Sequence, residues 1–159
     1  MRSRLPVVCL SVAAVLLLAA SGSLVYLVHN DSVTDGQRSA AVLAARQEAL
    51  ALTTLSAKTG ASDFNTVLAG SAGDLKQQLA AGKSDFTKTL SGDSVTSTGT
   101  VLDVGVVSLK ENTSATVLLD VRAAVNNKQT GKPETRIYHW KASLVYSNGA
   151  WLVTALEYV

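Results

Sequence analysis

The sequence predicts an α+β chain, in which an N-terminal transmembrane helix precedes a domain of helices packed on a curved antiparallel sheet. Three patterns predict it: an apolar run over residues 5–28, helical periodicity over residues 37–91, and two-residue periodicity with many β-branched side chains over residues 94–159. Helices followed by consecutive strands are typical of an α+β layout, because the helices cover one face of the sheet. The expected parts are a cytoplasmic tail (1–4), a transmembrane helix (5–28), a juxtamembrane linker (29–36) and one external domain (37–159).

The apolar run over residues 5–28 contains no Asp, Glu, Lys or Arg. As a helix it is about 36 Å long, which is enough to cross a hydrocarbon core of about 30 Å. Arg2 and Arg4 precede it and Arg38 is the only Lys or Arg soon after it, so the positive-inside rule predicts a single-pass protein of the cytoplasmic (inner) membrane with its C-terminal domain extracytoplasmic. The alternative is a signal peptide cleaved near residues 20–22, but the apolar residues beyond that site favour an uncleaved anchor.

The charge balance limits the partners of the domain. The chain has 14 Lys and Arg against 12 Asp and Glu, and Arg2 and Arg4 account for the whole excess. The domain is therefore neutral, and its evenly spread charges predict no nucleic-acid partner, which would need a basic face. The one cysteine, Cys9, lies in the apolar run and cannot form an intramolecular disulfide, so we expect the domain to be held together by packing.

Three helices are expected in the first half of the domain. The first runs from Gln37 to about Lys58, with Thr34 or Asp35 as its N-cap and Thr59-Gly60 as its stop. Its expected inward residues recur every three or four positions: Leu43, Ala45, Ala49, Leu50, Leu52 and Ser56. The second begins at Ser62-Asp63 and breaks around residues 70–73. The third begins at Asp74, and its expected inward residues are Leu75, Leu79, Phe86 and Leu90.

Four strands are expected after residue 92: Val95–Leu109, Ser114–Val125, Glu134–Ser147 and Ala150–Val159. Asn148-Gly149 predicts a type I′ hairpin between the last two, because both residues accept positive φ angles. The other connections are short enough for neighbouring antiparallel strands. Gly99 and Gly105 are the expected bulges that curve the first strand.

No residue pattern predicts a catalytic, cofactor-binding or metal site. His29 lies at the membrane boundary and His139 in the middle of a strand, and neither belongs to a cluster with ligand spacing. Asp103 and Asp120 interrupt apolar strands, and we expect both on the solvated face, with Arg122 as the partner of Asp120. If the curved sheet instead encloses a ligand pocket, the candidate pocket groups are Asp103, Tyr138 and His139.

Four aromatic residues of the last two strands are candidates for an interaction surface: Tyr138, Trp140, Tyr146 and Trp151. Aromatic side chains offer a large and rigid contact area, so a shared patch would suit a protein partner. Packing of the same residues in the core is the competing interpretation. The sequence leaves both open.

A family resemblance rests on four segments: Leu52-Thr53-Thr54-Leu55, the Asp63-Phe64 helix start, residues 95–101 at the opening of the sheet, and the ending from Asn148 to Val159. In these segments the chain resembles the Mce-associated membrane proteins of actinobacteria, and the ending is the most specific. The chain departs from the family pattern at Ala72-Gly73-Asp74-Leu75, where an aromatic residue would follow the acidic one. The resemblance implies an NTF2-like (cystatin-like cone) domain, similar to the periplasmic domain of VirB8-type secretion scaffolds.

The resemblance also implies a function: a non-catalytic accessory or scaffold protein of an Mce-type lipid or sterol import system. Its partners would be the membrane and subunits of an Mce transport complex, and it would need no cofactor. The alternative is a tethered NTF2-like domain that binds a small ligand or acts as an enzyme, and a secretion-type scaffold without a lipid connection is a third interpretation. The partner, the lipid and self-association into a homo-oligomer stay open at this level.

Overall fold

The computed structural model describes residues 34–92, 94–127 and 132–159, and residues 37–159 form one compact unit. The expected transmembrane helix (5–28), with Cys9, lies outside the described residues, as does His29. Among the helices of the described ranges, none is both long and apolar enough to cross a membrane.

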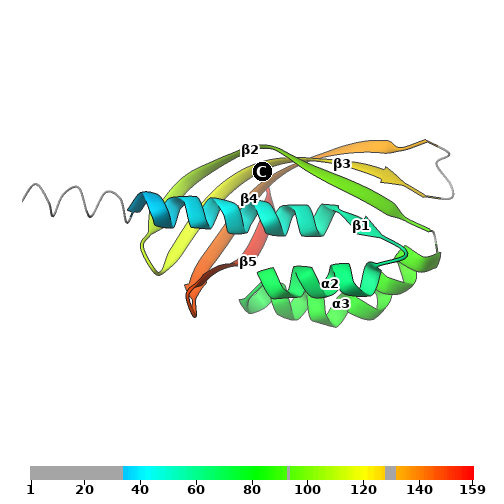
Figure 1. Cartoon of the computed structure of the whole chain (residues 1–159), viewed down its shortest axis with the longest axis horizontal. Helices are drawn as coiled ribbons and strands as arrows, with labels where there is room; N and C mark the ends of the chain where they lie inside the picture. Colours follow the sequence, from blue (N-terminus) through cyan, green and yellow to red (C-terminus); the bar gives the residue numbers. More distant parts are fainter. Residues whose placement is uncertain (1–33, 93, 128–131) are drawn as a thin grey trace, which may run out of the picture. The chain divides into compact units, whose positions relative to one another are not determined.

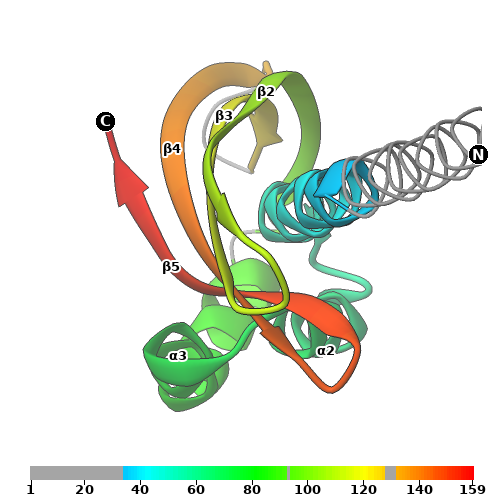
Figure 2. The ribbon, with the colours of Figure 1, turned by 90° about the vertical axis from the view of Figure 1, so that its left-hand side faces the viewer.

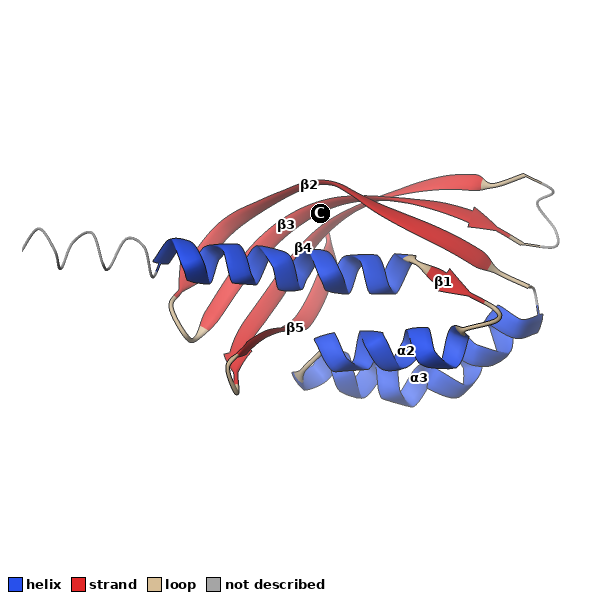
Figure 3. Cartoon of the chain, in the orientation of Figure 1, coloured by secondary structure: helices blue, strands red, loops and turns tan. Residues whose placement is uncertain are grey.

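Helices and one curved five-stranded sheet make up this unit (Figures 1 and 3). The helices are the first helix (residues 34–53), α2 (Gly60–Gly70) and α3 (Gly73–Gly92); the strands are β1 (Leu55–Ser56), β2 (Thr96–Lys110), β3 (Ser114–Asn126), β4 (Glu134–Ser147) and β5 (Ala150–Tyr158). The strands pair in sequence order, each antiparallel to the next. Figure 2 shows the strands curling around the side on which the first helix lies, with α2 and α3 together near β5. The predicted α+β class and sequential pairing are confirmed.

The core lies between the first helix and the inner face of the sheet. Ala41, Ala45 and Ala49 are at most 1% exposed and recur every four residues, so they form one stripe whose small side chains allow close approach to the sheet. Opposite them, β3 buries every second residue from Ala115 to Ala123, as its two-residue periodicity predicts. Leu43, predicted to face inward, is 54% exposed because the alanine stripe occupies the buried side.

The first helix differs from its prediction at both ends. Thr34 and Asp35 are helical rather than capping residues, and the helix ends at Thr53 instead of near Lys58. It ends early because residues 55–56 pair with the start of β2 as the edge strand β1. Local helical periodicity over residues 54–58 gives way to this long-range pairing.

The residues predicted to stop the first helix instead start the second. α2 begins at Gly60 with Thr59 as its N-cap, two residues before the predicted start. Asp63 organises this turn, because its Oδ2 accepts hydrogen bonds from the Thr59 hydroxyl at 2.8 Å and from the Ser56 backbone N–H at 3.0 Å. A carboxylate in the first turn also complements the positive end of the helix dipole.

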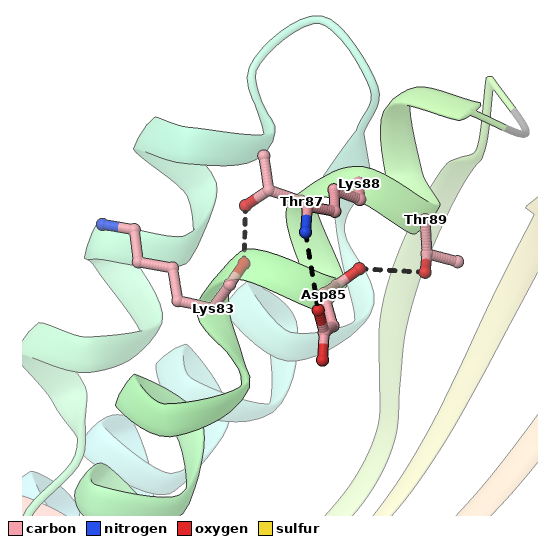
Figure 4. A network of polar contacts seen from close by, with 5 residues as sticks. All are labelled: Lys83, Asp85, Thr87, Lys88 and Thr89. Atoms are coloured by element: carbon pink, nitrogen blue, oxygen red, sulfur yellow. Dashed lines mark hydrogen bonds and ion pairs between the residues drawn. The ribbon is translucent and has the colours of Figure 1, made fainter.

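The third helix follows its prediction closely and runs through Gly82 without a break. Figure 4 shows how its later turns satisfy their hydroxyl groups: Thr87 donates to the Lys83 carbonyl at 2.8 Å, and Thr89 to the Asp85 carbonyl at 2.9 Å. On the α2 side, the rings of Phe64 and Phe86 lie 5.2 Å apart, which joins the two helices as a pair.

Two bulges curve β2, but neither lies at a predicted glycine. The register against β3 shifts between Val101 and Asp103 and again between Val106 and Ser108, so the extra residues are Leu102 and Val107. Gly99 has a different role, since a Cβ there would collide with the side chain of Thr53 at the end of the first helix. The sequence signal for the bulges is the spacing of inward-facing valines and leucines, which lengthens from two residues to three at each bulge.

The hairpin between β4 and β5 confirms the Asn-Gly prediction, with φ angles of 51° at Asn148 and 82° at Gly149. Beyond the turn the register shifts once, and Thr154 is the extra residue on β5. The shift brings Tyr158, rather than Glu157, opposite Trp140.

Candidate functional site

A cavity of about 460 Å³ lies between the end of the first helix, α3 and the inner face of the sheet. Elements far apart in the sequence supply its walls: Leu52 from the first helix, Phe86 and Leu90 from α3, Val125 from β3 and Leu156 from β5. Its volume is within the usual range of small-molecule sites, about 300–1,000 Å³. At this end the curved sheet therefore borders a hollow that is partly open to solvent.

Three aromatic rings form the sheet side of the cavity, and we call them the aromatic wall: Tyr138, Trp140 and Tyr158. The rings of Tyr138 and Trp140 stack with centroids 5.1 Å apart, and Tyr158 meets them at 6.4 and 6.5 Å. Trp140 is 8% exposed and Tyr158 is 74% exposed. The aromatic wall thus extends from the core to the solvent.

The serine and threonine hydroxyl groups that line the cavity donate hydrogen bonds within the protein. The hydroxyl of Thr53 donates to the Ala49 carbonyl at 2.6 Å, and that of Ser97 donates to the Thr53 carbonyl at 2.6 Å. Thr89 donates to a carbonyl of its own helix. The lining side chains include no acidic or basic residue, so the cavity suits an apolar molecule better than acid–base chemistry.

Only Tyr138 among the three predicted pocket groups lines the cavity. His139 lies between two inward-facing residues of β4, so strand alternation places it on the outer face. Asp103 lies on the same outer face and accepts a hydrogen bond from the Val104 backbone N–H at 2.8 Å. The expectation that Asp103 and Asp120 lie on the solvated face is confirmed, whereas Asp103 and His139 do not line the cavity as the alternative interpretation required.

The outer face instead joins Asp120 to His139. His139 Nδ1 and Asp120 Oδ1 are 2.7 Å apart, and the two side chains are about half exposed, at 56% and 47%. They are direct cross-strand neighbours, whereas the predicted partner Arg122 is two residues along the same strand, about 7 Å away. Over the ranges that the structure describes, no group of three His, Cys, Asp or Glu side chains is arranged to hold a metal ion.

The four predicted aromatic residues separate into two groups. Tyr146 and Trp151 pair near the hairpin, with ring centroids 5.3 Å apart, and Trp151 Nε1 donates to Gln37 Oε1 at 3.0 Å. Trp140 and Trp151 are 8% and 5% exposed, which places both in the core. The exposed aromatic residue of this region is Tyr158, which the sequence analysis did not select.

Glu48 is the second residue that the sequence analysis missed. It is 2% exposed and lines a separate hollow of about 650 Å³ between the first helix, α2 and β5. Burial raises the pKa of its carboxyl group to about 7, and the hydrogen bond with Ser71 only partly offsets this effect. The Ser71 oxygen lies 2.7 Å from Glu48 Oε1 and 2.8 Å from the Val67 carbonyl.

Ser71 has one hydroxyl hydrogen for these two contacts, and this fact bears on the protonation of Glu48. If Glu48 is neutral, its own O–H donates to Ser71, and Ser71 donates to the Val67 carbonyl. If Glu48 is ionised, both neighbours of the Ser71 oxygen are acceptors and one contact loses its hydrogen. The geometry therefore agrees with a neutral Glu48. In the sequence, a charged residue among helical alanines is expected on the solvent side of the helix, so no local pattern predicts that Glu48 is buried.

A family model with the description "Uncharacterized protein Rv1363c/MT1408-like" matches residues 5–159. The "Uncharacterized protein Rv1363c" of Mycobacterium tuberculosis is 28% identical over 159 residues, which cover 98% of this chain. The chain spans about 60% of the length of that relative.

Three solved structures have a similar fold. The periplasmic domain of DotI has a TM-score of 0.59 at 10% identity, covering 75% of this chain and 92% of that one. An IcmL-like type IV secretion system protein of Legionella pneumophila has a TM-score of 0.54 at 14% identity, with coverage of 74% and 88%. The VirB8 protein of Agrobacterium tumefaciens has a TM-score of 0.51 at 10% identity, with coverage of 72% and 86%. At these identities the likeness shows the fold alone, and it confirms the expected VirB8-like, NTF2-like architecture.

Proposed function

We propose that this chain, which belongs to the Rv1363c/MT1408-like family of uncharacterized proteins, is a non-catalytic, membrane-anchored accessory protein of an Mce-type lipid or sterol import system, as its sequence resemblance to Mce-associated proteins implies. In this proposal residues 5–28 anchor the chain in the cytoplasmic membrane, and the domain of residues 37–159 holds protein partners outside it. Tethering to the membrane raises the effective concentration of the domain near a permease, so modest contacts suffice for association.

The observation that carries this proposal is the division of chemistry between the two faces of the sheet. The inner face has an apolar, partly open cavity and an aromatic wall, while Asp103, Asp120 and His139 lie on the outer face. Binding and positioning need apolar and aromatic surface, whereas catalysis needs titratable groups that converge in an enclosed site. Glu48 is a buried acid at a separate hollow, but no second ionisable side chain is among the residues that line that hollow. The arrangement therefore favours a binding role over an enzymatic one.

The fold supports the same proposal. Two of the similar structures are an IcmL-like type IV secretion system protein and the periplasmic domain of DotI. By analogy, the domain of this chain is suited to an extracytoplasmic scaffold. The link to lipid import rests on the resemblance of the sequence to Mce-associated proteins.

Co-purification from the native host tests the proposal. The tagged full chain is isolated from membranes in mild detergent and its companions are quantified by mass spectrometry, with a chain ending at residue 36 as the control. We expect permease or substrate-binding subunits of an Mce system only with the full chain. Enrichment of other envelope proteins without Mce subunits would replace the lipid-import part with a secretion-type scaffold.

A second candidate function is the binding of an apolar ligand in the cavity of about 460 Å³, which is favoured by its size and its apolar lining. The same purified protein tests it, because bound lipids or other apolar molecules can be extracted and their amount per protein molecule measured. A stoichiometric apolar molecule without protein companions would favour this candidate over the scaffold.

A further inference from the structure

The edge strand of the sheet has a long side without a strand partner. β1 covers only Thr96 and Ser97 of β2, and Gly99 N–H donates to the Thr54 hydroxyl at 3.1 Å. From Thr100 to Lys110, no other strand of the described ranges pairs with this side of β2. Such an edge presents backbone N–H and C=O groups that can pair with an added strand.

A groove of about 570 Å³ lies between this part of β2 and the first helix. Val104 and Val106 supply its strand side, and Val42 and Leu43 supply apolar side chains from the helix. Leu43 is 54% exposed, although it is a large apolar residue. The groove therefore combines apolar surface with an open backbone edge.

Two arginines give the groove a positive charge. Arg38 and Arg46 both line it, and no ion pair joins either of them to an acidic side chain of the described residues. They are eight residues apart on one helix, which separates their Cα atoms by about 12 Å along the axis. In an extended chain, residues four apart are about 13 Å apart and face the same side.

The bulges of β2 limit what the edge can accept. Leu102 and Val107 interrupt the ladder on either side of residues 103–106, so the regular stretch is short. Bulges on an edge strand discourage pairing between whole sheets. A short segment avoids this obstacle. In such a segment, two residues four apart are about 13 Å apart, which matches the separation of about 12 Å between the two arginines.

We propose that this groove binds an extended segment of a protein partner, in which two acidic side chains four residues apart flank an apolar one. The acidic groups pair with Arg38 and Arg46, the apolar side chain contacts Leu43, and the backbone pairs with β2. This inference deepens the proposed function, on which it rests, by stating the chemistry of a partner segment.

A peptide titration on the full chain in detergent micelles tests the inference. The probe is the fluorescent peptide Thr-Thr-Glu-Thr-Val-Thr-Glu-Thr-Thr, and the control is Thr-Thr-Thr-Glu-Val-Glu-Thr-Thr-Thr, which has the same composition but turns its glutamates to the other side of the strand. We expect the probe to bind at least about tenfold more tightly than the control, and more weakly as salt is added. Equal binding of the two peptides would overturn the proposal.

Charge reversal tests whether Arg38 and Arg46 bind the peptide. Arg38→Glu with Arg46→Glu should weaken binding of the probe by more than about tenfold, because two charge-assisted contacts become repulsive. The matched control is Lys76→Glu with Arg122→Glu, which changes the net charge equally at exposed positions outside the groove and should change binding by less than about twofold. Similar losses in both double variants would mean a general charge effect and would refute the groove.

Hydrogen exchange decides whether a strand is added. We expect amide exchange of residues 101–109 to slow when the probe binds, and unchanged exchange there would overturn the proposal. Dimerisation of the chain that protects the same amides without peptide would show that a second copy occupies the groove, which also overturns it. If the Arg38 and Arg46 double variant still co-purifies with Mce subunits, the docking surface is wrong while the proposed function stands.

Discussion

The stability of the domain should fall as the pH rises towards neutrality, because Glu48 is buried in its neutral form. Burial raises the pKa of Glu48 from 4.5 to about 7. Between these two pH values the folded chain holds a proton that the unfolded chain has lost, so the free energy of unfolding decreases as the pH rises. The stabilisation is complete below about pH 4.5 and lost above about pH 7. A rise of this size corresponds to roughly 3 kcal/mol.

Glu48→Gln isolates this effect. Glutamine has nearly the same shape, its amide can donate to the Ser71 oxygen, and it has no charge at any pH. At pH 5 we expect the variant and the wild type to differ by less than about 1 kcal/mol. At pH 8 the variant should be the more stable by roughly 2–3 kcal/mol, since only the wild type then bears a buried charge.

Guanidinium unfolding of the full chain in detergent measures the free energy at both pH values, and the buried Trp140 and Trp151 report the transition by fluorescence. Glu157→Gln serves as the control, because Glu157 is exposed beside Lys141, and it should keep the pH dependence of the wild type. A wild-type stability that is the same at pH 5 and pH 8, or a Glu48→Gln variant with the wild-type slope, would refute the reasoning.

Further substitutions test other parts of the structure. Gly70→Ala should destabilise the domain by about 1–3 kcal/mol, because the new Cβ collides with the Glu48 carboxyl group. Gly82→Ala should instead stabilise α3 by about 0.5–1 kcal/mol, because no atom outside its own helix lies within 4 Å of the new Cβ; thermal unfolding compares the two variants. Val125→Phe should fill part of the cavity and reduce the fluorescence of a bound apolar dye, while Val145→Phe, outside the cavity lining, should not; equal loss would mean that the dye binds elsewhere. His139→Ala should cost less than about 1 kcal/mol in denaturant unfolding, because its pair with Asp120 is about half exposed, and a larger loss would indicate a hidden structural role.

Patterns within a few residues were sufficient for most of the secondary structure. The bounds predicted for β4, Glu134–Ser147, are those observed, and its inward side chains from Tyr138 to Tyr146 pack in the core at every second position. Asn148-Gly149 likewise determines its turn by local φ preferences, and the order of the strands follows from short connections. These are properties of neighbouring residues, so they can be read without knowing the rest of the fold.

The composition of the candidate site depends on contacts between residues far apart in the sequence. The first helix ends at Thr53 because β1 pairs with β2, and the extra residue Thr154 places Tyr158 opposite Trp140, so the aromatic wall depends on one register shift. Periodicity already favoured the solvated face for Asp103, and the register of the folded sheet shows that His139 pairs there with Asp120 and that neither Asp103 nor His139 lines the cavity. Glu48 became a buried acid only when α2 and Ser71 packed over it. Burial and cross-strand partners depend on residues far away in the chain. Local patterns therefore predict most of the helices and strands, whereas the end of the first helix, the bulges and the side chains that face one another depend on how the chain packs.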